Sequence, residues 1–233
     1  MPIQDRDYYR NPTQPPPVIG RLGMWSVTTW LIAINVAVFV IDSIVSFATN
    51  HYPLAEVGYF STTKAIYAGQ VWRFLSFQFI HGDTWHLFVN MLAMYFFGPL
   101  IESYLASRRY LAYYLICGIA GAAAYLVLAA TGILISDPRV PLVGASAGVF
   151  GILLGAARIA PNTRVMLLFP PIPIRLQTLA WIFVALAVLT ILRKGDNAGG
   201  EAAHIGGAIL GFVLIRNPRW LDVFDRLRRR RRY

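Results

Sequence analysis

A serine among small residues and a histidine in a later apolar stretch are the side chains in this sequence best suited to chemistry. Ser146 lies in the segment 143–151 (VGASAGVFG), between a polar loop and an apolar run. His204 lies in the segment 201–215, where an intramembrane histidine is costly and commonly functional. A serine hydroxyl beside an imidazole base is the arrangement of an activated nucleophile. The two residues therefore indicate nucleophilic catalysis.

The small residues around this pair also have a purely structural explanation. Small side chains about four residues apart let two membrane helices approach until their backbones touch. They follow both candidates, as Gly148, Gly151 and Gly155 after Ser146, and as Gly207 and Gly211 after His204. The segment 143–151 alone favours packing over catalysis, because short patterns of this kind are common. Close contact between the two helices would itself bring His204 to Ser146.

A second histidine and an asparagine share one helical face. His86 and Asn90 are four residues apart, so a helix places one above the other. Both side chains donate hydrogen bonds, through an imidazole N–H and an amide NH₂. Donors aimed at one point stabilise the oxyanion that forms during acyl transfer. We therefore predict an oxyanion hole at His86 and Asn90, whereas His81 lies off this face and is predicted to stabilise the preceding loop.

The histidines His81, His86 and His204 also suggest a zinc site, which is the main chemical alternative. Zinc-binding histidines on one helix favour a spacing of four residues. At that spacing from His86 the sequence has Asn90, a poor zinc ligand, and the single cysteine, Cys117, is distant in the chain. The pattern favours serine chemistry, with no metal and no cofactor.

No acidic residue stands out as a third member of a catalytic triad. Glu201 precedes His204 by three residues and would share its helical face. An acidic residue at the start of a helix, however, commonly complements the helix dipole. We therefore predict a Ser146–His204 pair that works without a carboxylate.

The composition places these residues in a membrane protein. Of the 233 residues, 57% are hydrophobic and only 14% are charged, and the mean hydropathy is +0.53. Six apolar segments are predicted to span the membrane, several of them near the roughly 20 residues that a crossing needs: 24–47, 85–105, 110–135, 146–160, 176–192 and 201–215. The segment 48–83 mixes polar and aromatic residues and is predicted to be a structured loop at the interface. The expected fold is all-α, a six-transmembrane helical bundle.

The basic residues predict the orientation of this bundle. With the N-terminus inside, sixteen of the 21 Lys and Arg residues fall on the inner side, which follows the positive-inside rule. The same distribution explains the net charge of +10 without a nucleic-acid partner. Residues 1–23 are predicted to be a flexible cytosolic segment rather than a signal peptide, 24–217 the membrane domain, and 218–233 a basic cytosolic tail. The expected location is a bacterial inner membrane, with both termini cytoplasmic.

A buried serine also needs a segment that opens to admit its substrate. The segment 195–200 (GDNAGG) combines glycines with turn-forming residues and is predicted to be a mobile loop. Trp181 and Phe183 on the fifth span are predicted to wedge against the second span in the closed form. An ordinary surface turn with lipid-facing aromatic residues explains the same sequence.

Taken in order, these motifs resemble the rhomboid family of intramembrane serine proteases over about residues 24–217. The resemblance is carried by Trp72-Arg73, by His81, His86 and Asn90-Met91, by Gly98 to Glu102, by Gly144-Ala145-Ser146, and by Ala203-His204-Ile205-Gly206-Gly207 with Gly211. Each motif is modest by itself, and their order and spacing together are specific. Trp72 and Arg73 would belong to the interfacial first loop.

The resemblance implies that Ser146 is the nucleophile and His204 the general base. It also implies an oxyanion hole formed by His86, Asn90 and the backbone N–H of Ser146, and sideways admission of a substrate helix between spans two and five. Two residues depart from the family pattern. Ala147 replaces the usual glycine, and Phe150 replaces a tyrosine that stacks on the catalytic histidine in many members, so we expect an altered rate rather than lost activity.

The sequence therefore predicts a serine protease that hydrolyses peptide bonds in or near the transmembrane segments of other proteins. Its expected partners are transmembrane protein substrates and the lipid bilayer, and its oligomeric state is left open. The leading alternative is a catalytically silent relative that binds membrane-protein clients, against which the presence of both Ser146 and His204 argues. A small transporter with histidine proton relays would require inverted repeats, which the two halves do not show.

Overall fold

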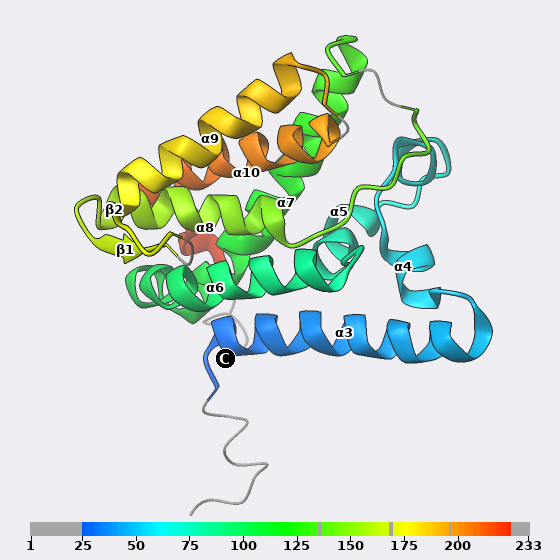
Figure 1. The fold of residues 1–233 in the computed structure, drawn as a ribbon, viewed down its shortest axis with the longest axis horizontal. Coiled ribbons are helices and arrows are strands. Elements are labelled where there is room, and N and C mark those ends of the chain that lie inside the picture. The colour runs from blue at the N-terminus through cyan, green and yellow to red at the C-terminus, as the bar shows by residue number, and fades with distance from the viewer. Residues whose placement is uncertain (1–24, 135–136, 168–169, 196, 225–233) are drawn as a thin grey trace, which may run out of the picture.

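The computed structural model describes residues 25–134, 137–167, 170–195 and 197–224, which are helical for most of their length (Figure 1). The main helices are α3 (Val27–Thr49), α6 (Thr84–Leu105), α7 (Ser107–Ala130), α8 (Ser146–Ile159), α9 (Leu176–Leu192) and α10 (Ala198–Arg216). Among the described residues, four helices (α3, α6, α7 and α10) are long and apolar enough to cross a membrane. α8 and α9 are shorter apolar helices of 14 and 17 residues. The predicted helical membrane fold is confirmed at this level.

The start of α10 differs from the prediction. A loop was expected through residue 200, but α10 begins at Ala198, so Gly199 and Gly200 are helical and the prediction is wrong there. Packing overrides the low helix propensity of glycine. A Cβ atom on Gly199 would lie 2.9 Å from the ring of Tyr125, so a glycine lets the first turn of α10 approach α7 closely. Asp196 lies outside the described residues.

The backbones of α8 and α10 touch in the centre of the bundle. A Cβ atom on Gly207 would lie 2.0 Å from the carbonyl oxygen of Ala147, and one on Gly211 would lie 2.5 Å from Cα of Gly151. These distances leave no room for a side chain at either position. The contact predicted from the small residues is therefore confirmed, and it sets the first turn of α8 beside the second and third turns of α10.

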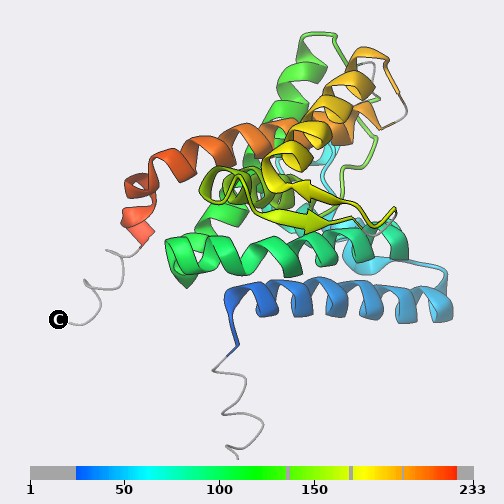
Figure 2. The ribbon, with the colours of Figure 1, turned by 60° about the vertical axis from the view of Figure 1, so that its left-hand side comes forward.

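Figure 1 and Figure 2 both show α3 lying along α6, on the side away from α10. The Glu102 carboxylate near the end of α6 accepts hydrogen bonds from the backbone N–H groups of Val27 and Thr28, at 2.8 and 2.9 Å. These N–H groups have no partner within the first turn of α3. Glu102 therefore caps α3 and holds it against α6.

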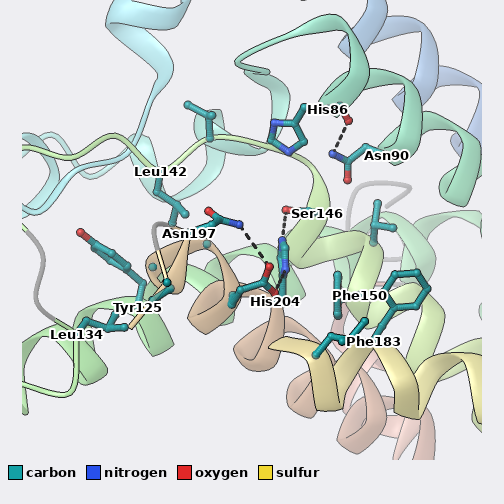
Figure 3. Close-up of a pocket in the computed structure, with 18 of the residues that line it drawn as sticks. His86, Asn90, Tyr125, Leu134, Leu142, Ser146, Phe150, Phe183, Asn197 and His204 are labelled. Atoms are coloured by element: carbon teal, nitrogen blue, oxygen red, sulfur yellow. Dashed lines mark hydrogen bonds and ion pairs between the residues drawn. The ribbon is translucent and has the colours of Figure 1, made fainter. Parts of the chain in front are cut away.

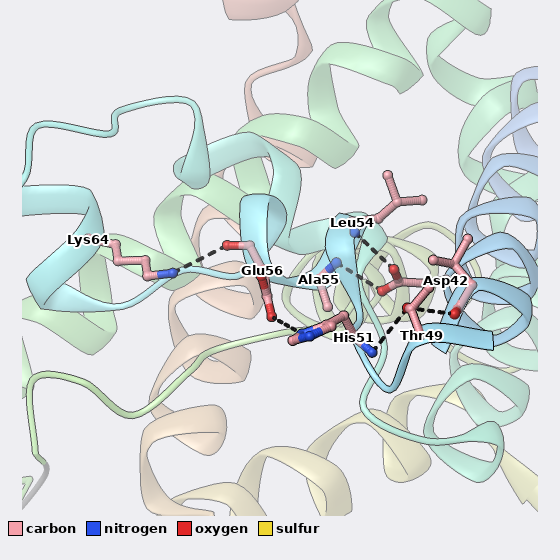
Figure 4. A network of polar contacts seen from close by, with 8 residues as sticks. Asp42, Thr49, His51, Leu54, Ala55, Glu56 and Lys64 are labelled. Carbon is pink, nitrogen blue, oxygen red and sulfur yellow. Dashed lines mark hydrogen bonds and ion pairs between the residues drawn. The ribbon is translucent and has the colours of Figure 1, made fainter. Parts of the chain in front are cut away.

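The segment between α3 and α6 folds into short helices, namely α4 (Pro53–Gly58), η2 (Thr63–Tyr67), α5 (Arg73–Ser76) and η3 (Phe77–Phe79). Figure 4 shows how it is tied to α3: the buried Asp42 carboxylate accepts from the backbone N–H groups of Leu54 and Ala55, both at 2.9 Å. The first turn of α4 is thereby capped by a side chain from the preceding helix. The segment is structured, as its composition predicts, and its position at a membrane interface stays a prediction.

A two-stranded antiparallel hairpin joins α8 to α9. Its strands are β1 (Arg164–Met166) and β2 (Pro173–Arg175), with Arg164 opposite Arg175. After α10 the chain forms η4 (Pro218–Asp222). Residues 1–24 and 225–233 lie outside the described residues, so the proposed segment 1–23 and most of the proposed tail 218–233 stay predictions.

Candidate active site

Ser146 and His204 are hydrogen-bonded to each other. Ser146 is the first residue of α8, and His204 lies in the second turn of α10. Their Oγ and Nε2 atoms are 2.7 Å apart (Figure 3). The glycine contact between the two helices accounts for this meeting, because it allows residues 58 positions apart in the chain to approach within hydrogen-bond distance. The structure thus brings together the two residues that the sequence singles out.

The imidazole of His204 is held on two further sides. The phenyl ring of Phe150, one turn after Ser146, stacks on it with centroids 4.3 Å apart and planes inclined by 9°. The Oε2 atom of Glu201 lies 2.8 Å from Nδ1. Glu201 was expected to share the helical face of His204, and this contact confirms that placement, whereas a pair that works without a carboxylate stays a prediction. α10 begins three residues before Glu201, so the carboxylate lies in the first turn of the helix, on the face that it shares with His204.

His86, on α6, lies beside Gly144 and close to Ser146. A Cβ atom on Gly144 would come within 2.7 Å of Nε2 of His86 and 3.4 Å of Oγ of Ser146. Gly144 also has a φ of +120°, which side chains other than hydrogen rarely tolerate. Glycine at this position therefore satisfies both the backbone conformation and the close approach of the imidazole.

Asn90 lines the same cavity as His86, Ser146 and His204. One hydrogen-bond donor of its amide is already used, because Nδ2 donates to the carbonyl oxygen of His86 at 2.9 Å. The amide nitrogen carries a second N–H. His86 and Asn90 therefore each keep a hydrogen-bond donor near Ser146. That these donors stabilise an oxyanion stays a prediction.

His81 lies behind the site and contacts the backbone. Its Nε2 accepts a hydrogen bond from the N–H of Ala145 at 3.4 Å, and its ring centroid is 5.1 Å from that of His86. Burial, which disfavours the charged imidazole, lowers the pKa of His81 to about 3. A neutral His81 thus supports the backbone just before Ser146. Among the described residues, no group of three or more His, Cys, Asp or Glu side chains is placed to hold a metal ion.

The Ser146–His204 pair faces a cavity of about 970 Å³ (Figure 3). Phe183 of α9 lies on one side of the pair, and Tyr125, Leu134 and Leu142 lie on the other. The sequence could not single out Tyr125 as a site residue, because an aromatic residue in an apolar span is usually part of the hydrophobic core. Its hydroxyl has no hydrogen-bond partner in the part of the chain that the structure describes.

The two aromatic residues predicted to wedge against the second span are placed differently. Phe183 lines the cavity, and its ring centroid is 6.2 Å from that of Phe150. Trp181 is not among the lining residues and is 54% exposed, so its predicted wedge against the second span stays a prediction. Residues two positions apart on a helix point about 200° apart, so only one of the two can face the cavity.

The rhomboid-domain family model matches residues 68–217, well over half of the chain and including every residue described at the site. The chain belongs to the rhomboid family. Trp72 and Arg73 of this rhomboid do not line the cavity, and they hold the segment before α6 together instead. The Trp72 indole donates to the carbonyl of Val57 at 3.2 Å, and the buried Arg73 guanidinium donates to that of Glu56 at 2.9 Å.

Relatives of this rhomboid occur in bacteria, plants and yeast. The protein named Rhomboid protease AarA from Providencia stuartii is 28% identical over 217 residues, which cover 83% of this chain and 72% of the relative. RHOMBOID-like protein 4 from Arabidopsis thaliana is 31% identical over 172 residues, covering 72% of this chain and 40% of the relative. Rhomboid protein 1, mitochondrial, from Saccharomyces cerevisiae is 31% identical over 143 residues, covering 58% of this chain and 38% of the relative. The chain spans less than half the length of several of these relatives.

Proposed function

We propose that this rhomboid protein is an intramembrane serine protease that cleaves peptide bonds in or near the transmembrane segments of other proteins. The observation that carries the proposal is the 2.7 Å hydrogen bond between Oγ of Ser146 and Nε2 of His204, inside a cavity large enough for a segment of peptide. A hydroxyl at this distance from an imidazole nitrogen is within range for proton transfer to a general base. Membership of a family that includes a named protease supports the same activity.

The proposed chemistry has two stages. His204 removes the proton from the Ser146 hydroxyl as Oγ attacks the peptide carbonyl, and the resulting oxyanion is stabilised by the side chains of His86 and Asn90 and the backbone N–H of Ser146. His204 then gives the proton to the leaving amine as the C–N bond breaks. In the second stage His204 activates a water molecule, which attacks the acyl-serine ester and releases the second product.

The depth of the site follows from the short length of α8. At a rise of 1.5 Å per residue its 14 residues extend about 21 Å, less than the roughly 30 Å of a hydrocarbon core. We therefore propose that α8 and α9 complete a six-span bundle and that Ser146 lies below the membrane surface. Non-helical backbone at such depth is tolerated where it lines a cavity, which fits the segment before Ser146.

The cavity wall suggests how a substrate helix reaches Ser146. Apolar side chains from both α6 and α9 line it, among them Val89 and Ala93 on α6, and Phe183 and Leu186 on α9. A substrate helix moving between these two helices would remain in apolar surroundings until it reaches the polar pair. The distribution of basic residues further supports cytoplasmic termini. Because the relatives include bacterial and mitochondrial proteins, a bacterial inner membrane stays a prediction.

The test combines a covalent probe with a substrate panel. The purified protein and Ser146→Ala are each treated with a fluorophosphonate, which reacts with activated serines, and are incubated with a panel of single-span membrane proteins. We expect the unmodified protein to be labelled and to cleave at least one substrate, and Ser146→Ala to do neither. A protein that binds single-span clients but is neither labelled nor active would be a silent relative, and the protease proposal would be wrong.

A further inference from the structure

The carboxylate of Glu201 contacts the imidazole nitrogen of His204 that faces away from Ser146. Its Oε2 lies 2.8 Å from Nδ1 of His204, and its Oε1 lies 3.4 Å from Nδ2 of Asn197. The two side chains of the pair are largely buried, with 14% of His204 and 20% of Glu201 exposed. Both carboxylate oxygens therefore have a partner, which holds the group in one orientation.

This contact selects the tautomer of the imidazole. Nε2 of His204 accepts the Ser146 proton only if the ring proton is on Nδ1. An ionised carboxylate offers acceptors alone, so Glu201 favours a proton on Nδ1. The three residues lie in series, with the hydroxyl of Ser146 on one edge of the ring and the carboxylate on the other. With its proton held on Nδ1, the neutral ring of His204 can accept the Ser146 proton at Nε2.

The same contact supplies a counter-charge. When His204 takes up the Ser146 proton it becomes a cation in a mostly buried position, which is unfavourable unless the charge is paired. The other titratable or charged groups at the cavity are His86 from α6, Tyr125 from α7, Lys194 after α9 and Asp137 before α8. Within the described residues, the hydrogen bonds of the His204 ring go to Ser146 and Glu201 alone.

We propose that Glu201 is a positioning residue for His204, so that the site is a Ser146–His204–Glu201 triad rather than a pair. The proposal rests on the protease function proposed above. Complementing the dipole of α10 would explain an acidic residue in its first turn. It does not explain a carboxylate oxygen 2.8 Å from Nδ1 of the ring whose other nitrogen contacts Ser146.

The test is the rate of fluorophosphonate labelling of Ser146 as a function of pH, measured on the purified full chain. Glu201→Gln keeps the size and an acceptor but removes the charge, and Glu201→Asp keeps the charge. We expect Glu201→Gln to lower the plateau rate about tenfold or more, compared with about 10⁴-fold in kcat when the aspartate of a soluble triad is neutralised. The acid limb of the pH–rate profile of Glu201→Gln should move to lower pH by about one unit, because the imidazolium loses its counter-charge. Glu201→Asp should recover part of the rate and return the limb toward its original pH.

The matched control is Asp137→Asn, which removes a negative charge from the same cavity. Asp137 is paired with Arg139 at 2.6 Å rather than with His204, so the acid limb should stay in place. Thermal unfolding of each variant separates loss of fold from loss of rate. The triad is wrong if the acid limb of Glu201→Gln does not move, or if Glu201→Asp labels no faster than Glu201→Gln. If Ser146 of the unmodified protein is not labelled at any pH, the protease function itself fails, and the triad with it.

Discussion

The phenyl ring of Phe150 lies parallel to the imidazole of His204, with 4.3 Å between the ring centroids. Phe150 is one helical turn after Ser146, so α8 supplies both the candidate nucleophile and the surface on which its base rests. The ring of His204 is thus fixed by a stack on one face and by hydrogen bonds at both nitrogens. Its position depends on α8 and α10 together.

Shortening Phe150 should therefore reduce turnover more than substrate binding. We expect Phe150→Leu to lower kcat by about tenfold or more, because loss of the stack lets the imidazole leave the reactive geometry. Phe150→Tyr keeps the ring and should retain most of the rate. The measurement is kcat and KM on one cleaved single-span substrate. Equal kcat for Phe150→Leu and the unmodified protein would show that the stack does not position His204.

Ser146 and His204 should behave as one unit in a double-mutant cycle. We expect Ser146→Ala and His204→Ala each to abolish detectable cleavage, and the double variant to be no worse than either, since each residue acts only through the other. Cleavage assays with purified protein, with and without a chelator, measure this. Residual proteolysis by Ser146→Ala would contradict its assignment as nucleophile, and a chelator-induced loss that zinc restores would favour the metal alternative.

His86 and Asn90 should affect the transition state rather than the fold. Removing one oxyanion donor costs about 100- to 1,000-fold in kcat in soluble hydrolases. We expect a smaller loss for Asn90→Ala, because one of its amide N–H groups is used within α6 and the other donors remain. Turnover and thermal unfolding are measured for both single variants and the double variant. Full turnover in all three would exclude an oxyanion hole on α6.

Phe183 and Trp181 form a matched pair for testing substrate access through α9. Phe183 lines the cavity, whereas Trp181 is 54% exposed and does not. We expect Phe183→Ala to raise cleavage of a transmembrane substrate severalfold, since opening rather than chemistry can limit turnover. Cleavage of a short soluble peptide should hardly change, and Trp181→Ala should leave both rates unchanged. Equal effects of the two variants would show that the cavity-lining ring is not the obstacle.

A reversible disulfide between α6 and α9 gives an independent check on the same route. It should slow cleavage of the membrane substrate and leave the soluble peptide unaffected, and reduction should restore the rate. Full-rate cleavage of the membrane substrate by the crosslinked protein would show that no opening between these helices is needed.

The buried His81 should make stability depend on pH. Its pKa is lowered from 6.5 to about 3 in the folded protein, so between these values the unfolded chain binds the additional proton. His81 therefore makes its full contribution to the free energy of unfolding above about pH 6.5. This contribution decreases as the pH falls toward 3, by at most about 1.4 kcal/mol per pH unit. His81→Gln should flatten this decline in thermal unfolding curves. An equally steep decline in the variant would assign the effect to other groups.

The sequence determined the main helices and the candidate pair, because both follow from local pattern. Apolar segment length predicts helices that cross a membrane, and glycine spacing predicts that α8 and α10 touch. That contact is enough to bring Ser146 to His204. The sequence could also indicate that His86 and Gly144 belong to one site, since the family motifs include both residues.

Tertiary structure decided which neighbours complete the site. The start of α10 at Ala198 depends on the packing of Gly199 against Tyr125 of α7, a contact between distant parts of the chain. Local propensity predicted a loop up to residue 200 and a helix from Glu201, whereas this packing starts α10 three residues earlier and places Glu201 within its first turn. The choice between Trp181 and Phe183 likewise depended on how α9 is rotated about its axis. Both residues are apolar and aromatic, so hydropathy treats them alike, and only packing against α8 and α10 sets which one meets the cavity.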